Sequence, residues 1–260
     1  MIPECKQIRA DILKIAHASG HGHIPTCFSI VEALFAIYAV MRHNPLDPEN
    51  PDRDIFILSK GHGALAHYCV LARSGYFPIA DVYSFGMYNS RYGCHADRLK
   101  VRGIEASTGS LGHGIGLAVG MALGCRLKKS SRNVFTIIGD GESNEGSVWE
   151  ALMVADSLGL DNLTVVYDNN MSHARGLQII NPAMKFAAFG CEVIEVDGHA
   201  VDQLSKALAA PQSKTKAIVA NTVKGYGCET LAANQYEWHR KSPNDTQLQQ
   251  LMEELDAAAI

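Results

Sequence analysis

The chain has 260 residues, of which 47% are hydrophobic and 19% charged, and its formal net charge at pH 7 is −4. This balance is typical of a globular protein, and the length suits one large α/β domain or two small domains. The acidic balance argues against a nucleic-acid-binding protein, which would need clustered Lys and Arg. The short basic cluster at residues 126–129 is better interpreted as the solvated end of a helix.

The cysteines and the first residues indicate a cytoplasmic protein without a membrane partner. Seven cysteines are scattered without any C-x-x-C pair, which argues against a zinc site and against a secreted disulfide framework. Charged residues between Glu4 and Asp11 interrupt any apolar signal sequence. The most apolar stretch, residues 26–41, is too short to span a bilayer and contains Glu32. We therefore expect reduced thiols and no membrane-spanning helix.

The first third of the chain is predicted to be helical. Apolar residues recur at nearly helical spacing over residues 8–18. A second helix is expected over residues 29–42, ending before Pro45, and a third over residues 63–73, ending at Gly75.

Strands and helices are predicted to alternate over the following residues. Residues 134–138 form a continuous apolar run that stops at Gly139, as expected for a strand buried on both faces. The alternation implies an α/β fold, with a mostly parallel sheet and helices on both faces. Ligands of such sheets lie beyond the carboxyl ends of the strands. Further strands are expected at 163–167, 192–196 and 217–222, and further helices at 147–158, 183–189, 201–209 and 248–259.

Polar residues follow two neighbouring strands of the predicted sheet. Gly139-Asp140-Gly141 comes directly after one strand, and Tyr167-Asp168-Asn169-Asn170 ends the next. Strand ends within one βαβ unit lie side by side, so Asp140 and Asn170 can converge on one hard cation such as Mg²⁺ or Ca²⁺, held together with a phosphorylated ligand. G-D-G alone is more often a simple turn, but the combination of the two segments predicts a metal and diphosphate site.

This combination resembles the thiamine-diphosphate-dependent enzymes, whose signature is G-D-G followed, one helix and strand later, by an Asn-containing segment. The resemblance implies that the Asp140 and Asn170 side chains and the Ser172 backbone carbonyl bind a divalent cation, which is Mg²⁺ or alternatively Ca²⁺ or Mn²⁺. It also implies that Glu145 lies at a subunit interface.

Further segments resemble the transketolase family in order and over nearly the whole chain. The resemblance implies a single diphosphate-binding domain over residues 1–260, with a helical part to about 130, a sheet part to about 225 and a C-terminal tail. The matching segments are Gly22-His23, Ser59-Lys60-Gly61-His62, Cys94-His95-Ala96-Asp97, Thr108-Gly109-Ser110-Leu111-Gly112, Val223-Lys224-Gly225-Tyr226-Gly227 and Trp238-His239.

The family performs two-carbon ketol transfer between sugars, and the resemblance assigns roles to histidines. His23, His95 and His239 are expected to be catalytic, because imidazole can give and take a proton near neutral pH. His62 is expected to hold the cofactor diphosphate, and His21 is the less favoured alternative to His23. The residues expected to contact thiamine diphosphate are His62, Gly109, Leu111, Gly141, Glu142 and Asn170. Five other histidines are interpreted as surface or core residues: His17, His43, His67, His173 and His199.

The chain departs from the family pattern beside the expected substrate channel. Pro25 follows His23 closely where small flexible residues are usual, and Cys94 and Ala96 flank His95 where glycine and proline are usual. Arg102 replaces a proline. These differences concern the choice of ketose substrate and not the binding of the cofactor. The ketose is expected to be phosphorylated or otherwise anionic.

The family also has a second, pyrimidine-binding domain, which no segment of this chain resembles. The cofactor site of the family lies between the two domain types. The resemblance therefore implies that a separate C-terminal subunit completes the enzyme, in an α₂β₂ heterotetramer.

Three other interpretations compete with this one. The chain could be a subunit of another thiamine-diphosphate enzyme, such as a 2-oxo-acid dehydrogenase or a deoxyxylulose-phosphate synthase. Gly112-x-Gly114-x-Gly116 could suggest a nucleotide-binding oxidoreductase, but it follows no clear strand and its spacing departs from G-x-G-x-x-G. A scaffold that has lost its chemistry is disfavoured by the intact predicted ligands and histidines.

Overall fold

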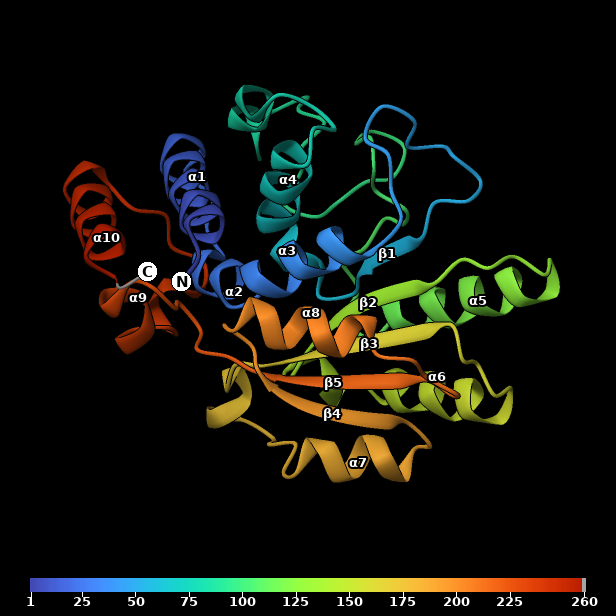
Figure 1. Ribbon diagram of the computed structural model, residues 1–260. Coiled ribbons are helices and arrows are strands. Elements are labelled where there is room, and N and C mark those ends of the chain that lie inside the picture. The colour runs from blue at the N-terminus through green and yellow to red at the C-terminus, as the bar shows by residue number, and fades with distance from the viewer. Residues whose placement is uncertain (259–260) are drawn as a thin grey trace.

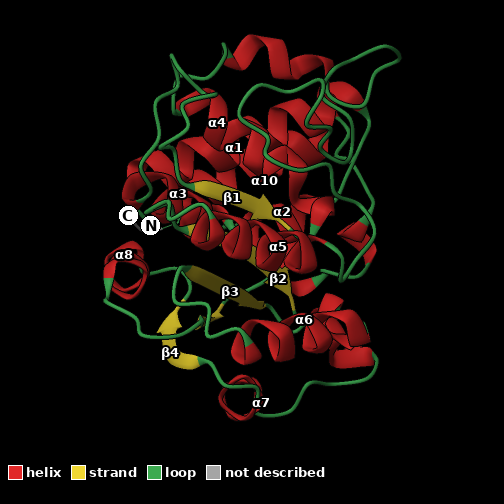
Figure 2. Cartoon of the chain, turned by 90° about the vertical axis from the view of Figure 1, so that its right-hand side faces the viewer, coloured by secondary structure: helices red, strands yellow, loops and turns green. Residues whose placement is uncertain are grey.

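The computed structural model describes residues 1–258, and its centre is a five-stranded sheet with the strand order β1-β2-β3-β5-β4. All neighbouring strands are parallel. Helices cover both faces of the sheet (Figures 1 and 2), so the predicted α/β fold class is confirmed. The strands are β1 (Ile55–Leu58), β2 (Val134–Gly139), β3 (Leu163–Asn169), β4 (Glu192–Asp197) and β5 (Lys216–Asn221).

Two apolar cores lie on opposite faces of the sheet. Alternate residues of a strand point to opposite faces, so Phe135 and Ile137 join one core while Val134 and Ile138 join the other. The smaller core contains α5 (Gly114–Leu127), α6 (Gly146–Ser157) and α7 (Pro182–Ala188). The larger core contains α1 (Pro3–Ser19), α2 (Ile24–Ser29), α3 (Val31–Val40), α4 (Ala64–Arg73), α8 (Val201–Ala209), α9 (Glu229–Ala233) and α10 (Asp245–Ala257).

Four elements were not predicted from the sequence, namely the short helices α2 and α9, strand β1 and helix α5. Strand β1 has only four residues, and a short apolar run with no alternation cannot be told from a helix segment by periodicity. Helix α5 contains Gly114, Gly116, Gly120 and Gly124, and each glycine lowers helix propensity. Packing of α5 against β1, β2 and α6 overrides that propensity.

Several predicted helices differ in their limits. The helix expected over residues 29–42 is α3, which spans only residues 31–40, and the unpredicted helix α2 ends at Ser29 just before it. Pro25 is accommodated in the first turn of α2, where no intrahelical N–H is needed. The last helix begins three residues earlier than expected because Asn244 and Gln247 form a capping box. Its expected last residue, Ala259, lies outside the described residues.

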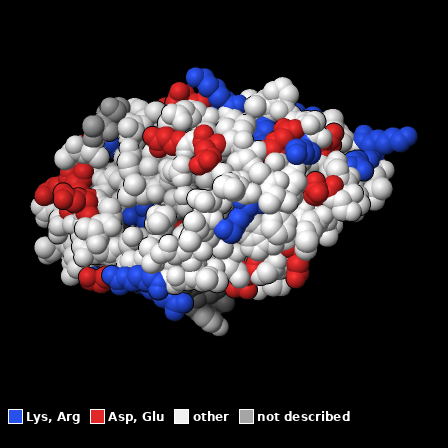
Figure 3. Space-filling model, turned by 90° about the horizontal axis from the view of Figure 1, so that it is seen from below, with Lys and Arg blue, Asp and Glu red and all other residues white. Residues whose placement is uncertain are grey.

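On the face seen in Figure 3, Lys and Arg are scattered among Asp and Glu and form no broad basic surface. None of the helices in residues 1–258 is both long enough and apolar enough to cross a bilayer. All seven cysteines are free thiols, and only Cys94 is not buried.

A buried ion pair connects the N-terminal helices to the segment after β5. Arg9 donates to both carboxylate oxygens of Glu32 at 2.6 and 2.7 Å, and both side chains are fully buried. Burial alone would raise the pKa of Glu32, but the Arg9 guanidinium and a hydrogen bond from His199 hold it below its ordinary value. His199 contacts Glu32 through Nδ1 and accepts the Val223 N–H through Nε2 at 2.8 Å. This network therefore anchors the Val223-Lys224 backbone.

Replacing Glu32 by Leu should lower the free energy of unfolding by about 3–5 kcal/mol, because Arg9 would be left buried without its anion. Lys206→Ala is the matched control, since the Lys206–Asp202 pair at 3.7 Å is exposed and should contribute less than about 1 kcal/mol. Urea denaturation measures both values. Equal losses in the two variants would contradict the account of this network.

Candidate active site

A cavity of about 700 Å³ lies at the carboxyl ends of β2 and β3. It brings together every residue predicted for the site except Glu145. Glu145 is exposed at the start of α6, with its side chain beside Gly112. The lining residues are His23, Thr26, Lys60, His62, His95, Gly109, Leu111, Gly139, Asp140, Gly141, Glu142, Asn170, Ser172, His239 and Arg240.

Asp140 lies at one end of the cavity with an unsatisfied carboxylate oxygen. Gly139 of β2 pairs in register with Asp168 of β3, so Asp140 follows directly at a shared edge. Oδ1 of Asp140 accepts the Gly141 N–H at 2.6 Å, whereas Oδ2 is buried without a hydrogen bond. Burial and the neighbouring Asp168 raise the pKa of Asp140. A bound cation would offset both effects, so the residues present fit a cation site.

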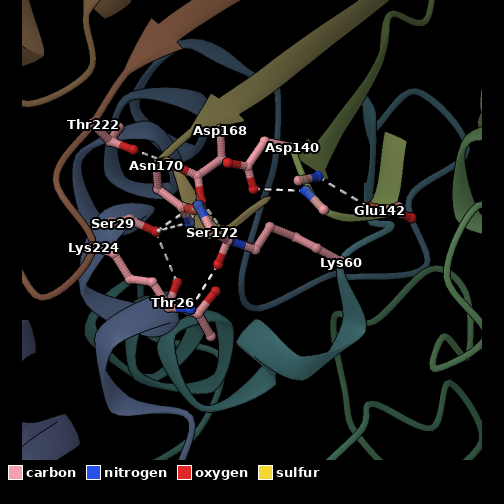
Figure 4. A network of polar contacts seen from close by, with 12 residues as sticks. Thr26, Ser29, Lys60, Asp140, Glu142, Asp168, Asn170, Ser172, Thr222 and Lys224 are labelled. Atoms are coloured by element: carbon pink, nitrogen blue, oxygen red, sulfur yellow. Dashed lines mark hydrogen bonds and ion pairs between the residues drawn. The ribbon is translucent and has the colours of Figure 1, made fainter. Parts of the chain in front are cut away.

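Asp168 gathers hydrogen bonds from four parts of the chain, as Figure 4 shows. Its Oδ2 accepts from Lys60 Nζ at 2.5 Å, from Ser29 Oγ at 2.7 Å and from Asn170 Nδ2 at 2.7 Å. Its Oδ1 accepts from Thr222 Oγ1 at 2.5 Å. Burying a carboxylate is costly unless donors of this kind surround it. Asp168 therefore fixes the positions of α2, the loop after β1 and the ends of β3 and β5.

The same contacts fix the orientation of Asn170. Its Nδ2 donates to Asp168 and, at 3.2 Å, to Ser29, so the amide nitrogen faces the interior. Its Oδ1 therefore faces away from Asp168 and accepts the Ser172 N–H at 3.0 Å. The side-chain oxygen of Asn170 lines the cavity beside Asp140 and Ser172, which gives an oxygen donor set suited to Mg²⁺ or Ca²⁺.

Glu142 shapes the loops around the cavity. Its carboxylate accepts hydrogen bonds from Ser59 Oγ at 2.5 Å, the Gly112 N–H at 2.9 Å and the Gly139 N–H at 3.0 Å. Burial raises its pKa, and these three donors oppose that rise. Gly112 needs to be glycine because it has φ +78° and a Cβ there would lie 2.4 Å from Ser147 Oγ.

Three histidine rings form a cluster on the wall of the cavity. The ring centroids of His23 and His239 are 5.3 Å apart, and those of His23 and His62 are 5.7 Å apart. His95 packs over Gly109, where a Cβ would lie 3.4 Å from the imidazole. His23 has φ +78°, a strained conformation for a residue with a side chain. Such strain is typical of functional positions.

The pKa values of these histidines are strongly lowered. Burial is the main cause for His23, His62 and His239, and neighbouring positive groups add to it. The pKa falls to about 4 for His23, about 2 for His62 and about 4 for His239. All three imidazoles are therefore neutral at pH 7, each with one N–H donor and one acceptor nitrogen.

Lys224 determines the tautomer of His239. Its ammonium group lies 2.6 Å from Ser172 Oγ and 3.2 Å from His239 Nδ1. Burial and the nearby Lys60 lower the pKa of Lys224 to about 8, so it still carries its charge at pH 7. Because an ammonium group only donates, Nδ1 of His239 accepts and its Nε2 carries the proton.

The structure distinguishes His23 from His21. His23 lines the cavity, whereas His21 is exposed and its ring packs against Gly86 and Phe85. Two of the histidines that were interpreted as surface or core residues make specific polar contacts in the structure. His199 anchors the Val223 backbone, and His173 Nδ1 lies 2.9 Å from Asp140 Oδ2.

Sequence reasoning assigned no roles to several side chains at the site. Lys60 and Asp168 lie within the quoted S-K-G-H and Y-D-N-N segments, and a buried Lys–Asp pair joins two segments that are 108 residues apart. For Asp168 the sequence signal was a carboxylate at the end of an apolar strand, whereas Lys60 follows a strand that was not predicted. Ser29, Thr222 and the Lys224 contacts carry no such signal, because their partners are defined only by the fold.

Replacing Asp168 by Asn should lower the free energy of unfolding by about 3 kcal/mol, because Lys60 would lose its carboxylate partner in a buried position. The exposed Asp161→Asn change is the matched control and should cost no more than about 0.5 kcal/mol. Chemical denaturation checks both. A stability for Asp168→Asn equal to that of the control would mean that Asp168 does not organise the site.

The histidine pKa values predict how stability depends on pH. An unfolded histidine takes up a proton near pH 6.5, but folded His62 stays neutral to about pH 2. The unfolded chain therefore binds more protons below pH 6.5, and stability falls as the pH drops from there. His62→Asn should remove about 2 kcal/mol of the loss between pH 7 and 4.5.

Thermal melts over this pH range provide the measurement, with the exposed His113→Asn change as the control. The melting temperature of the His62 variant should depend less steeply on pH than that of the control. Parallel curves for the two variants would show that His62 is protonated at its ordinary pH in the folded chain.

Several known proteins are similar to this chain in sequence. The chain matches the family described as "Transketolase, thiamine diphosphate binding domain" over residues 3–257. It is 36% identical over 261 residues to one subunit of the apulose-4-phosphate transketolase of Actinobacillus succinogenes, covering 97% of this chain and 94% of that protein. It is 41% identical over 217 residues to the 6-deoxy-6-sulfo-D-fructose transketolase subunit SqwG of a Clostridium species, covering 80% of this chain and 79% of that protein.

Solved transketolase structures have the same fold. The transketolase of Leishmania mexicana superimposes with a TM-score of 0.88 at 29% identity, covering 97% of this chain but only 41% of that one. These relatives favour a transketolase over a nucleotide-binding oxidoreductase or another class of thiamine-diphosphate enzyme. The chain belongs to the transketolase family, as a thiamine-diphosphate-binding domain.

Proposed function

We propose that this chain binds thiamine diphosphate with a divalent cation and is the N-terminal subunit of a transketolase. The enzyme would transfer a two-carbon ketol unit from a ketose to an aldose acceptor. One observation carries the proposal: Asp140, Asn170 and Ser172 lie at adjacent strand ends in a cavity that also contains four histidines.

The donor set supports Mg²⁺, with Ca²⁺ or Mn²⁺ as alternatives. The described residues contain no cluster of three or more His, Cys, Asp or Glu side chains able to hold a metal. A cation here would therefore use the Asp140 carboxylate, the Asn170 amide oxygen and the Ser172 carbonyl, leaving positions for diphosphate oxygens. The ammonium groups of Lys60 and Lys224 near this end of the cavity favour a polyanion.

The cofactor-binding residues surround the rest of the cavity. We assign His62 to the diphosphate and Gly109 and Leu111 to the rings, as all three line the cavity. Gly141 has no atom within 4 Å of where a Cβ would be, so a ligand could approach its backbone closely. Glu142 acts through its hydrogen bonds to the Gly112 and Gly139 backbone.

The histidines supply the proton transfers. Thiamine diphosphate, when bound, supplies a thiazolium that stabilises negative charge on the transferred carbon. His239 presents Nε2–H and can donate to a substrate oxygen, because Lys224 occupies its Nδ1. His23 and His95 line the same cavity, and neutral imidazole at His23 can accept a proton from a substrate hydroxyl.

We infer that a separate C-terminal subunit with a pyrimidine-binding domain completes the site in an α₂β₂ assembly. Both similar proteins above are named as transketolase subunits. Glu145 is assigned to a subunit interface, because it is exposed beside α6, where Met153 and Val154 are also exposed. The free, mostly buried cysteines suit a cytoplasmic location.

The donor sugar is proposed to be anionic. The names of the two relatives specify a sugar phosphate and a sulfonated sugar, and both groups carry negative charge. Arg240 lies at the edge of the cavity next to His239 and is exposed, so its guanidinium could pair with such a group.

Thiamine diphosphate with Mg²⁺ should raise the melting temperature of the chain. A ligand at one hundred times its dissociation constant adds about 2.7 kcal/mol, which corresponds to roughly 5–10 °C for a chain of this size. Asp140→Ala and Asn170→Ala should abolish the shift, while Asp161→Ala should keep it. Together with its partner subunit, the unmodified chain should also transfer ketol units from a ketose phosphate.

Two results would contradict the proposed function. A stabilising shift with NAD, and none with thiamine diphosphate and Mg²⁺ either for the chain alone or in its complex, would reject the proposed cofactor. Efficient ketol transfer by the chain alone would reject the requirement for a separate subunit.

A further inference from the structure

His173 is a buried imidazole in an otherwise exposed turn. It belongs to the 3₁₀ turn Ser172–Arg175, which follows β3, and Met171 with φ +59° reverses the chain just before it. Met171, Ala174 and Arg175 are exposed, but His173 is only 7% exposed. The turn therefore directs one side chain inward, toward the strand ends that carry Asp140 and Asn170.

The buried nitrogen of His173 faces the unsatisfied oxygen of Asp140. His173 Nδ1 and Asp140 Oδ2 are 2.9 Å apart, and their side chains are 4% and 1% exposed. Neither atom makes a hydrogen bond of acceptable geometry. Their contact is an ion-pair contact without hydrogen-bond geometry, and a buried polar atom left without a hydrogen bond costs about 1–3 kcal/mol. A ligand shared by both atoms would remove that cost.

A divalent cation fits the separation of these atoms. In octahedral coordination with bonds of about 2.1 Å, neighbouring ligand atoms lie roughly 3.0 Å apart. The observed 2.9 Å is compatible with this value, and the missing hydrogen bond between the two atoms distinguishes the pair from a direct imidazole–carboxylate hydrogen bond. We propose that His173 Nδ1 is a further protein ligand of the divalent cation, alongside Asp140, Asn170 and Ser172. This inference rests on the proposed function, which requires a cation at this position.

A nitrogen ligand would change the preference among cations. Mg²⁺ and Ca²⁺ are held almost entirely by oxygen ligands, whereas affinity for a site with a nitrogen ligand rises along the first-row transition cations, of which Mn²⁺ is the weakest binder. The site would therefore bind Mn²⁺ more tightly, relative to Ca²⁺, than a site built from oxygen atoms alone. His173→Ala should weaken Mn²⁺ binding at least about tenfold and change Ca²⁺ binding by less than about threefold.

The direct test is pulsed electron paramagnetic resonance of bound Mn²⁺. The chain is labelled with ¹⁵N-histidine and studied in complex with its partner subunit, thiamine diphosphate and Mn²⁺. The unmodified protein should show a hyperfine coupling between Mn²⁺ and a histidine ¹⁵N, and His173→Ala should lose it. His17→Ala should retain it, because that ring contacts Pro243 and Asp245 instead.

The outcomes separate this inference from the proposed function. Mn²⁺ that binds together with thiamine diphosphate but shows no ¹⁵N coupling would overturn the role of His173 and leave the proposed function standing. A coupling that persists in His173→Ala would overturn it too, since another histidine would be the ligand. If Mn²⁺ binding did not depend on thiamine diphosphate, the proposed function itself would fail.

Discussion

The buried contact between Asp168 and Lys60 is the interaction on which the site depends. Asp168 lies near the end of β3, and Lys60 follows β1 and lines the cavity, so one ion pair connects the ends of these two strands across β2. Through Ser29 and Thr222 the same carboxylate also holds α2 and the end of β5. The free-energy cost of burying the Asp168 carboxylate is offset only when all of its hydrogen-bond donors are in place. The stability of the fold therefore depends on the geometry of the site.

The site also depends on three cavity histidines that remain uncharged at neutral pH. The cavity places three imidazoles within about 6 Å of each other, beside two ammonium groups. Charging any of these rings would add a further cation to a partly buried site. The protein thereby keeps His23 and His239 in the form that can exchange a proton with a substrate oxygen. The Arg9–Glu32–His199 network supports this arrangement at a distance, because it anchors the backbone from which Lys224 reaches His239.

Much of the fold was predictable because it follows from periodicity and strand burial. Strand β2 and the motif after it were found because an apolar run stops at Gly139-Asp140. Strand β1 and helix α5 were not found, since four apolar residues lack a period and four glycines disfavour a helix. Their structure is determined by tertiary packing on the sheet, which a single sequence does not encode locally.

The site was predictable for residues within motifs and not for residues that act through distant partners. Asp140, Asn170 and the four histidines belong to segments with a recognisable order, and the fold gathers them in one cavity. His173 and His199 looked like ordinary histidines because nothing in their neighbours indicates Asp140 or Glu32 as a partner. Those contacts link residues 33 and 167 positions apart, and only the three-dimensional structure brings them together.

The most direct measurement is a crystal structure of the chain with its partner subunit, thiamine diphosphate and Mg²⁺. The account predicts density for a cation between the Asp140 carboxylate and the Asn170 amide oxygen, with diphosphate oxygens completing its coordination. Cofactor density in a different place, or an empty cavity at saturating cofactor, would contradict the assignment of these strand ends as the diphosphate site.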